Sequence, residues 1–276
     1  MACQKKSSMI SFFHVGVDNS MNGSEAKTSP DILETVFMSF RNFLPNASNT
    51  NITILMAWEK TFEAGLIGQS ALFARIGEIS EILEEVNLQI SSLDNLSEAR
   101  KVRARSVVSL FIPAVTLANI NNNAWSMTSN CSVENCGSLG FLGDALRPHF
   151  SENVLSEQDV SEILGVLEEV KTLLNQNDFP LRLKIILKRK LDVLIWRLKH
   201  PEFETLQQAS DALGQATLTA NQMERLWPID SSREAAADMR RKLFECFKKT
   251  SEVAERGGKM VVAGKIIYDV AKPLLG

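Results

Sequence analysis

The stretch from Ser156 to His200 constrains the fold most, because it has the pattern of two amphipathic helices joined by a short polar loop. Ser156 begins an N-terminal capping pattern, since its hydroxyl can accept a hydrogen bond from the backbone N–H of Asp159. Acidic residues in this first turn also favour the positive end of the helix dipole. The polar run 175–178 ends the first helix, and Pro180 suits the first turn of the next. So short a loop predicts an antiparallel hairpin.

Both helices of this hairpin have apolar stripes at helical spacing. In the first helix the stripe consists of Val160, Ile163, Leu164, Leu167, Val170 and Leu174. The second has Leu183, Leu187, Leu191, Leu194 and Leu198 on one side, and Ile185, Ile186, Val193 and Trp196 roughly opposite. We therefore expect the second helix to have neighbours on two sides. Because the first helix is acidic and the second basic, we also expect the pair to be matched by charge.

The basic side chains of the second helix are the first candidate functional surface. The candidates are Lys184, Lys188, Arg189 and Lys190, within a basic helix over residues 182–199. A basic helix suggests nucleic-acid binding. The alternative is a solvated structural helix whose charges pair with its acidic neighbour. The net charge of −3 gives the whole chain no attraction to phosphate backbones, so such binding would need a local patch.

The rest of the chain also has helical patterns, which predicts an all-α fold, a multi-helix bundle built from antiparallel hairpins. We expect helices near 30–44, over 52–92 with a break near Gly65, after Pro201, and from Ser231 to Gly257. Residues 9–17 allow one short N-terminal strand or extended segment. The pattern divides the chain into an N-terminal extension (1–29), an N-terminal helical region (30–150) and a C-terminal helical region (151–276), and the two helical regions either share one core or have one each.

The apolar run from Val107 to Ile120 is interrupted by Pro113 and has only about 14 residues. Crossing a bilayer takes about 20. We interpret it as a buried, kinked central helix, with a membrane-inserting hairpin as the alternative. Residues 126–135 and the following glycines, Gly137, Gly140 and Gly143, read as loop.

No catalytic, metal-binding or cofactor-binding constellation is predicted. Cys131 and Cys136 have the spacing of one half of a zinc site, with His149 as a third candidate ligand, but a second pair is missing. The same residues do not supply a third group for nucleophilic catalysis. The glycine series lacks the Gly-Lys-Ser/Thr ending of a phosphate-binding loop. The sequence therefore predicts no catalytic residue, no metal and no cofactor, and favours a protein that is not an enzyme.

The C-terminal segment over residues 259–272 is the second candidate functional feature. It is an apolar helical pattern with a cationic stripe, and its candidate residues are Lys259, Lys265, Ile266, Ile267, Tyr268 and Lys272. Such a helix can enter a membrane interface or a groove of a partner. The alternative is a terminal helix that closes the core.

These observations together predict a non-enzymatic, helical protein-interaction component of a larger bacterial assembly. Four scattered cysteines and no signal-peptide pattern predict a cytoplasmic location. A protein partner or a second copy of the chain is the expected ligand. The alternatives are a membrane-acting effector that uses residues 259–272 and a nucleic-acid binder that uses residues 182–199.

Overall fold

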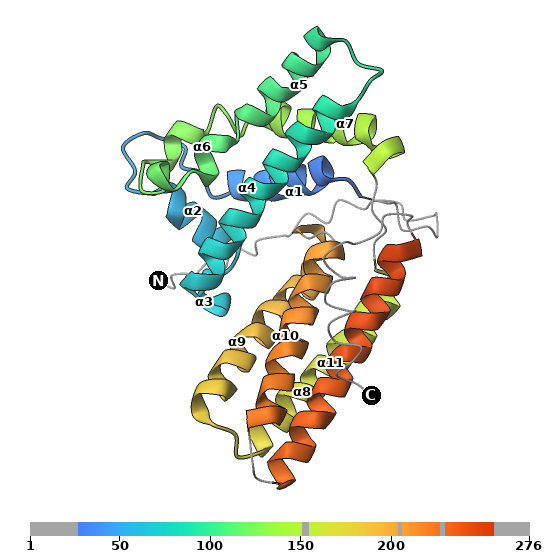
Figure 1. Cartoon of the computed structure of the whole chain (residues 1–276). Coiled ribbons are helices and arrows are strands. Elements are labelled where there is room, and N and C mark those ends of the chain that lie inside the picture. Colours follow the sequence, from blue (N-terminus) through green and yellow to red (C-terminus); the bar gives the residue numbers. More distant parts are fainter. Residues whose placement is uncertain (1–26, 151–154, 204–205, 227–229, 257–276) are drawn as a thin grey trace, which may run out of the picture.

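The computed structural model describes residues 27–150, 155–203, 206–226 and 230–256, and the regular structure of these ranges is helical (Figure 1). An isolated bridge between Thr53 and Asn123 adds no sheet to this part of the chain. The predicted all-α fold is thus confirmed. The strand or extended segment expected at residues 9–17 lies outside the described residues.

Residues 27–150 form the N-terminal body. Its elements are α1 (Ser29–Arg41), α2 (Ile54–Thr61), α3 (Ala64–Ile67), α4 (Gln69–Ser92), α5 (Glu98–Ser109), α6 (Ile112–Val115), two 3₁₀ turns, η1 (Leu117–Asn119) and η2 (Ala124–Met127), and α7 (Val133–Phe150). Helix α1 packs mainly on α7 and α4. The core of this body is aromatic: Trp58 stacks on Phe40 and Phe62 with ring centroids 4.2 and 5.2 Å apart.

The break expected near Gly65 divides residues 54–92 into α2, α3 and α4. Two residues with positive φ flank the short α3: Glu63 at 50° and Gly68 at 82°. Residues with a side chain rarely adopt this conformation, and Gly68 adopts it without steric cost. The chain can therefore turn sharply twice and bring α2 and α4 against the same core.

The single kinked helix expected for residues 107–120 was wrong. Helix α5 ends at Ser109, and Pro113 stands in the first turn of the separate helix α6. A proline begins a helix more easily than it continues one, because it has no N–H to donate. The indole Nε1 of Trp58 donates to the carbonyl of Ala114 at 2.7 Å, which ties α6 to the core. Among the described helices none is long and apolar enough to cross a membrane.

The loop expected at Gly137, Gly140 and Gly143 was also wrong, because all three glycines lie inside α7. At a spacing of three residues, they occupy one side of the helix. Gly140 and Gly143 face α1 so closely that an added Cβ would lie 2.3 Å from Glu34 Oε2 and 2.1 Å from Asp31 Oδ1, respectively. Gly140 and Gly143 thus permit a close approach of α1 and α7, and none of the three glycines forms a turn.

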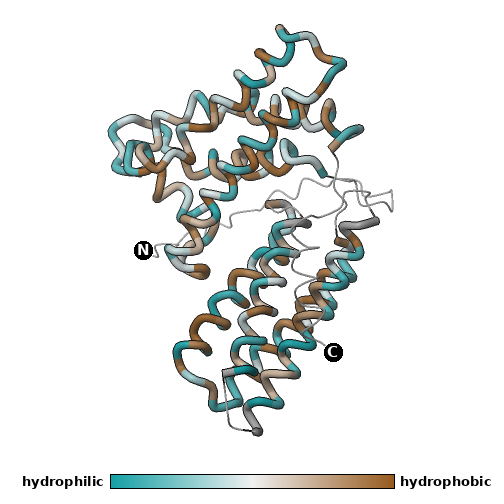
Figure 2. The backbone as a smooth tube through the Cα atoms, viewed as in Figure 1, coloured by the Kyte–Doolittle hydropathy of each residue, from teal (hydrophilic) through white to brown (hydrophobic). Residues whose placement is uncertain are grey.

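Residues 155–256 form the C-terminal bundle, whose long helices lie side by side in Figure 1. Its elements are α8 (Glu157–Gln176), α9 (Leu181–Lys199), the 3₁₀ turn η3 (Pro201–Phe203), α10 (Leu206–Leu226) and α11 (Asp230–Arg256). The start of α8 is as predicted: the Ser156 hydroxyl accepts from the backbone N–H of Asp159 at 3.1 Å. Hydrophobic residues recur along each helix (Figure 2) and meet in a core separate from that of the N-terminal body. Helix α10 continues through Gly214 without interruption.

The charge matching expected between α8 and α9 was wrong, because acidic residues of α8 pair with a different helix. The acidic residues of α8 pair with α11: Lys249 contacts Asp159 at 2.8 Å and also Glu162, and Lys242 contacts Glu169 at 2.6 Å. The ion pair between α8 and α9 has the reverse polarity, with Lys171 on α8 and Asp192 on α9 at 3.1 Å. Helix α8 therefore presents its acidic side to α11, and the basic residues of α9 remain for other contacts.

Candidate protein-interaction surface

The two bodies meet at the C-terminal end of α9. Trp196 is 5% exposed and belongs to the core of the N-terminal body, although it lies on a bundle helix. Its ring lies 5.9 Å from that of Phe62 and 6.2 Å from that of Phe203, measured between centroids. His200 stacks on Trp196 at 4.6 Å. The end of α9 is thus buried on both sides, as its second apolar stripe predicted.

A half-buried carboxylate contributes to this junction. Glu78 on α4 contacts Arg75 at 2.5 Å and also Arg197 on α9. The two guanidinium groups are almost fully buried, at 1% and 8% exposed, and Arg75 also donates to the carbonyl of Phe203 at 3.3 Å. The Arg75 guanidinium carbon lies 5.4 Å from the ring centroids of both Phe62 and Trp196, within the range of a cation–π contact. One acidic side chain therefore links the N-terminal body to the bundle.

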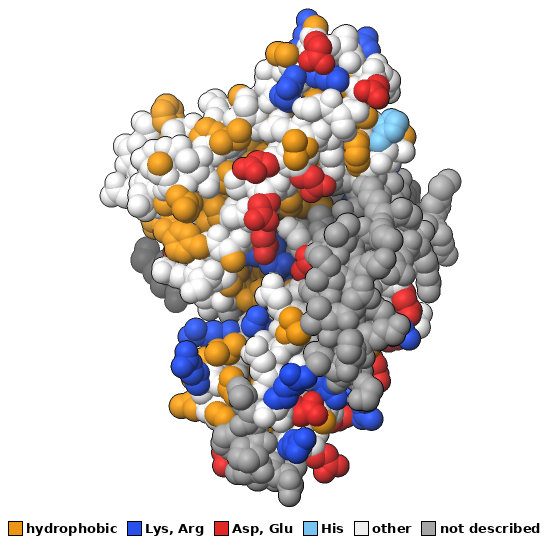
Figure 3. Space-filling model, in the orientation of Figure 1, with side chains coloured by type: hydrophobic (Ala, Val, Ile, Leu, Met, Phe, Trp, Pro, Cys, Tyr) orange, Lys and Arg blue, Asp and Glu red, His pale blue; other side chains and the backbone are white. Residues whose placement is uncertain are grey.

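A groove lies beside this junction, between α4, α9 and α10, with a volume of about 440 Å³. Its α4 side contains Glu78 and Glu81, and its α9 side contains Arg189, Lys190 and Arg197. In Figure 3 acidic side chains gather on the part of the upper body nearest the lower one, and basic and acidic side chains mix on the lower body. Ligand sites often form where two bodies meet, and this groove lies at such a place.

The N-terminal half of α9 is exposed, in contrast to its other end. Leu181, Ile185 and Ile186 are 72%, 41% and 38% exposed, so the second apolar stripe expected to be buried is uncovered here. Three exposed basic residues stand among them: Arg182, Lys188 and Arg189. We call these six residues the α9 face; in Figure 3 orange and blue side chains mix over this helix, at the left of the lower body.

Only two of the four predicted basic candidates belong to the α9 face. Lys188 and Arg189 are exposed on it, whereas Lys184 Nζ donates to the carbonyls of Asn175 and Asn177 at 3.2 and 3.4 Å. Lysine near a helix C-terminus stabilises the otherwise unpaired carbonyls, so Lys184 is a cap for α8. Lys190 Nζ donates to Gln215 Oε1 on α10 at 3.3 Å. Arg182 belongs to the predicted basic helix 182–199 but was not among the four candidates, although its place one turn before Ile186 was a usable signal.

The other candidate set falls on residues that the structure does not describe. Lys259, Lys265, Ile266, Ile267, Tyr268 and Lys272 all lie within 257–276. The proposal of a membrane-inserting or partner-binding C-terminal helix therefore stays a prediction.

The thiols considered for metal binding or catalysis are buried. Cys131 and Cys136 are both in the core of the N-terminal body, and burial raises the pKa of each, that of Cys136 to about 11. Within the described ranges no group of three or more potential ligand side chains could hold a metal ion. Thiols that stay protonated are weak nucleophiles and weak ligands, so these two act as small apolar core residues.

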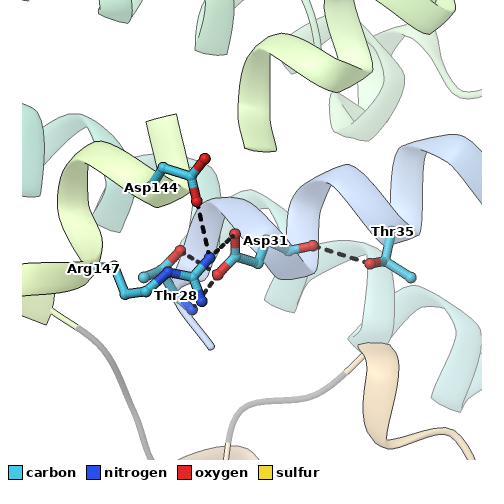
Figure 4. Close-up of polar contacts among 5 residues, drawn as sticks. All are labelled: Thr28, Asp31, Thr35, Asp144 and Arg147. Carbon is cyan, nitrogen blue, oxygen red and sulfur yellow. Dashed lines mark hydrogen bonds and ion pairs between the residues drawn. The ribbon is translucent and has the colours of Figure 1, made fainter. Parts of the chain in front are cut away.

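A cluster of carboxylates between α1 and α7 was missed by sequence reasoning (Figure 4). Asp31 accepts hydrogen bonds from the backbone N–H and the hydroxyl of Thr28, both at 2.8 Å, and contacts Arg147 at 3.3 Å. Arg147 also contacts Asp144 at 3.2 Å. Burial, and then the charges of Asp31 and Asp144, raise the pKa of nearby Glu34. This cluster fixes the start of α1 against α7.

The sequence matches no protein-family model, and it has no significant match among curated protein sequences or among solved structures. The surfaces described above must therefore carry the functional argument by themselves.

Proposed function

We propose that this protein is a non-enzymatic interaction component, a helical scaffold that binds another protein through the α9 face. The observation that carries the proposal is the contrast within one helix. The C-terminal half of α9 is buried in the junction, whereas the other half exposes three large aliphatic side chains among three basic ones. Apolar side chains grouped on a surface and surrounded by polar ones are typical of protein-binding sites.

The same face has features that favour a protein over a nucleic acid. A phosphate backbone is bound by basic groups in sufficient number to give a steep dependence on salt. On the α9 face, Leu181, Ile185 and Ile186 lie among the basic side chains. Removing these three side chains from water is favourable only when they pack against another apolar surface. Asp192 also lies on this helix, one turn beyond Lys188. A protein offers both the apolar contact and the opposite charges.

The test is site-specific photo-crosslinking in the cells that produce this protein. A photoreactive phenylalanine analogue replaces Ile185 in one strain and Val102 in another. Val102 is the matched control, because it is also an exposed aliphatic residue on a helix, 56% exposed on α5, and belongs to the other body. We expect one discrete protein adduct from position 185, identified by mass spectrometry, and none of the same mass from position 102.

The adduct is then reconstituted from the purified protein and purified partner. The proposal fails if position 185 yields no protein adduct, if both positions give the same adducts, or if the adduct contains nucleic acid. In the last case replacement of Arg182, Lys188 and Arg189 by alanine should weaken RNA or DNA binding and reduce its salt dependence.

A further inference from the structure

We propose that the segment bound by the α9 face is an amphipathic helix with an apolar stripe and acidic flanks, carried by a different protein. This inference rests on the proposed function and adds the chemistry of the partner. Three observations lead to it: the line of the exposed stripe, the way the same stripe is covered at its other end, and the charges that remain beside it.

The exposed side chains lie in line along one side of α9. At 100° per residue, Leu181, Ile185 and Arg189 fall within a narrow stripe, and Trp196 continues the same stripe at the other end of the helix. The exposed part, residues 181–190, is about 15 Å long, or nearly three turns. That length suits a helix of similar length lying along it, with apolar side chains at i, i+4 and i+7.

The covered end of the stripe indicates what kind of surface fits it. There, Trp196 packs against Phe62 of the N-terminal body, and Arg197 beside it is paired with the carboxylate of Glu78. Apolar contact together with an acidic residue against a basic one is thus how this stripe is already bound within the molecule. The exposed end is continuous with that interface and has the same two kinds of side chain.

The basic residues at the exposed end have charge available for a partner. No ion pair among the described residues involves Arg182, Lys188 or Arg189. Asp159 and Glu169 of the neighbouring α8 contact α11 instead. Glutamate or aspartate on the flanks of a partner helix would supply the missing opposite charge and favour it over a neutral or basic one.

The experiment measures fluorescence anisotropy of a labelled probe with the full chain. The probe is a stapled model helix of about 16 residues, with leucines at i, i+4, i+7 and i+11 and glutamates on both flanks. A second probe has lysines in place of the glutamates. We expect the acidic probe to bind at least about tenfold more tightly than the basic one, with a difference that shrinks as salt is added.

Two variants of the α9 face and one control give the inference its specificity. The variant Leu181→Ser/Ile185→Ser should lose about tenfold or more in affinity for the acidic probe. The variant Arg182→Glu/Lys188→Glu/Arg189→Glu should reverse the preference and bind the basic probe, which a variant that merely failed to fold would not do. The control Arg100→Glu/Arg103→Glu changes exposed basic residues of α5 and should bind like the unaltered chain. Circular dichroism verifies the fold of each.

Other occupants of the α9 face would give different results. Loss of concentration-dependent self-association in the serine variant would identify a second copy of this chain as the occupant. Binding to vesicles containing about one third phosphatidylserine, abolished by the glutamate variant, would identify an anionic membrane. Either result, equal binding of the two probes, or no binding of the acidic probe, overturns the inference. If self-association, equal binding of the two probes or no binding of the acidic probe overturned the inference, a discrete protein adduct at position 185 would still support the proposed function. Membrane binding would overturn both.

Discussion

Replacement of Gly143 by alanine tests the close approach of α1 and α7. An added Cβ at this position would lie 2.1 Å from Asp31 Oδ1, 2.9 Å from Asp31 Cγ and 3.0 Å from Thr28 Oγ1. A Cβ atom does not approach another heavy atom to within 3 Å, so Asp31 must move or the helices must separate. Asp31 has little freedom to move, because its carboxylate accepts two hydrogen bonds from Thr28 and contacts Arg147.

The magnitude follows from three contributions. Overpacking costs about 1–3 kcal/mol, and the loss of the cap at the start of α1 costs about 1 kcal/mol. Alanine offsets about 1 kcal/mol of this through its higher helix propensity. We therefore expect Gly143→Ala to lower the free energy of unfolding by about 2 kcal/mol.

Gly137→Ala is the matched control on the same helix. An added Cβ at Gly137 would meet no atom within 4 Å, so only the gain in helix propensity remains. We expect this variant to be more stable than the unaltered chain by about 0.5–1 kcal/mol. Urea denaturation followed by circular dichroism measures both variants. The reasoning is refuted if the two substitutions change stability in the same direction by similar amounts.

Three further predictions concern single side chains. Because the pKa of Glu34 is raised above its ordinary 4.5, ionisation of this carboxyl weakens the fold as pH rises through the raised value. In urea denaturation at pH 7, Glu34→Gln should therefore be more stable than the unaltered chain. This difference in stability should vanish below pH 4.5. Glu78→Gln should cost about 3 kcal/mol in the same assay, because two buried guanidinium groups share that carboxylate, whereas the exposed Glu81→Gln should change stability by less than about 0.5 kcal/mol. Burial raises the pKa of Cys136 to about 11 and that of Cys246 to about 12, so alkylation of the folded protein at pH 8, followed by mass spectrometry, should be about a hundredfold slower than in urea, and equal rates would contradict the burial of these thiols.

The hairpin of α8 and α9 was predictable because its signals are local. A cap at Ser156, a polar loop and Pro180 act within a few residues of where they stand, and the helical spacing of the leucines repeats along each helix. Such signals fix where a helix starts, where it ends and which side it buries. They do not identify the neighbour against which that side packs. The acidic residues of α8 were therefore recognised, but their partner was expected on α9 and is α11.

The glycines of α7 show the same limit from the other side. Glycine at every third position is typical of a loop when only local preference is considered. The environment of Gly140 and Gly143 is created by α1, more than a hundred residues earlier in the sequence, whose Glu34 and Asp31 side chains occupy the space that a Cβ would take. A spacing of three was the available signal, since it places all the missing side chains on one side of a helix.

The α9 face was predicted only in part, because its exposure depends on a distant part of the chain. The sequence identified a basic helix with two apolar stripes, and the structure has both. How much of the second stripe is covered depends on where the N-terminal body ends along α9, and that is set by contacts such as Trp196 with Phe62. Lys184 and Lys190 were assigned to the surface by composition, although each has a neighbour that binds it.

The placement of Trp196 and Phe203 limits how this chain can be divided into separate parts. Both belong to the N-terminal core, yet they are attached to the bundle. A gene fragment encoding only the bundle would produce a protein with two bare aromatic rings, and a fragment encoding only the N-terminal body would leave Phe62 uncovered. Each half alone would expose aromatic surface that the other half covers, so we expect both halves to be stable only when they are made as one chain.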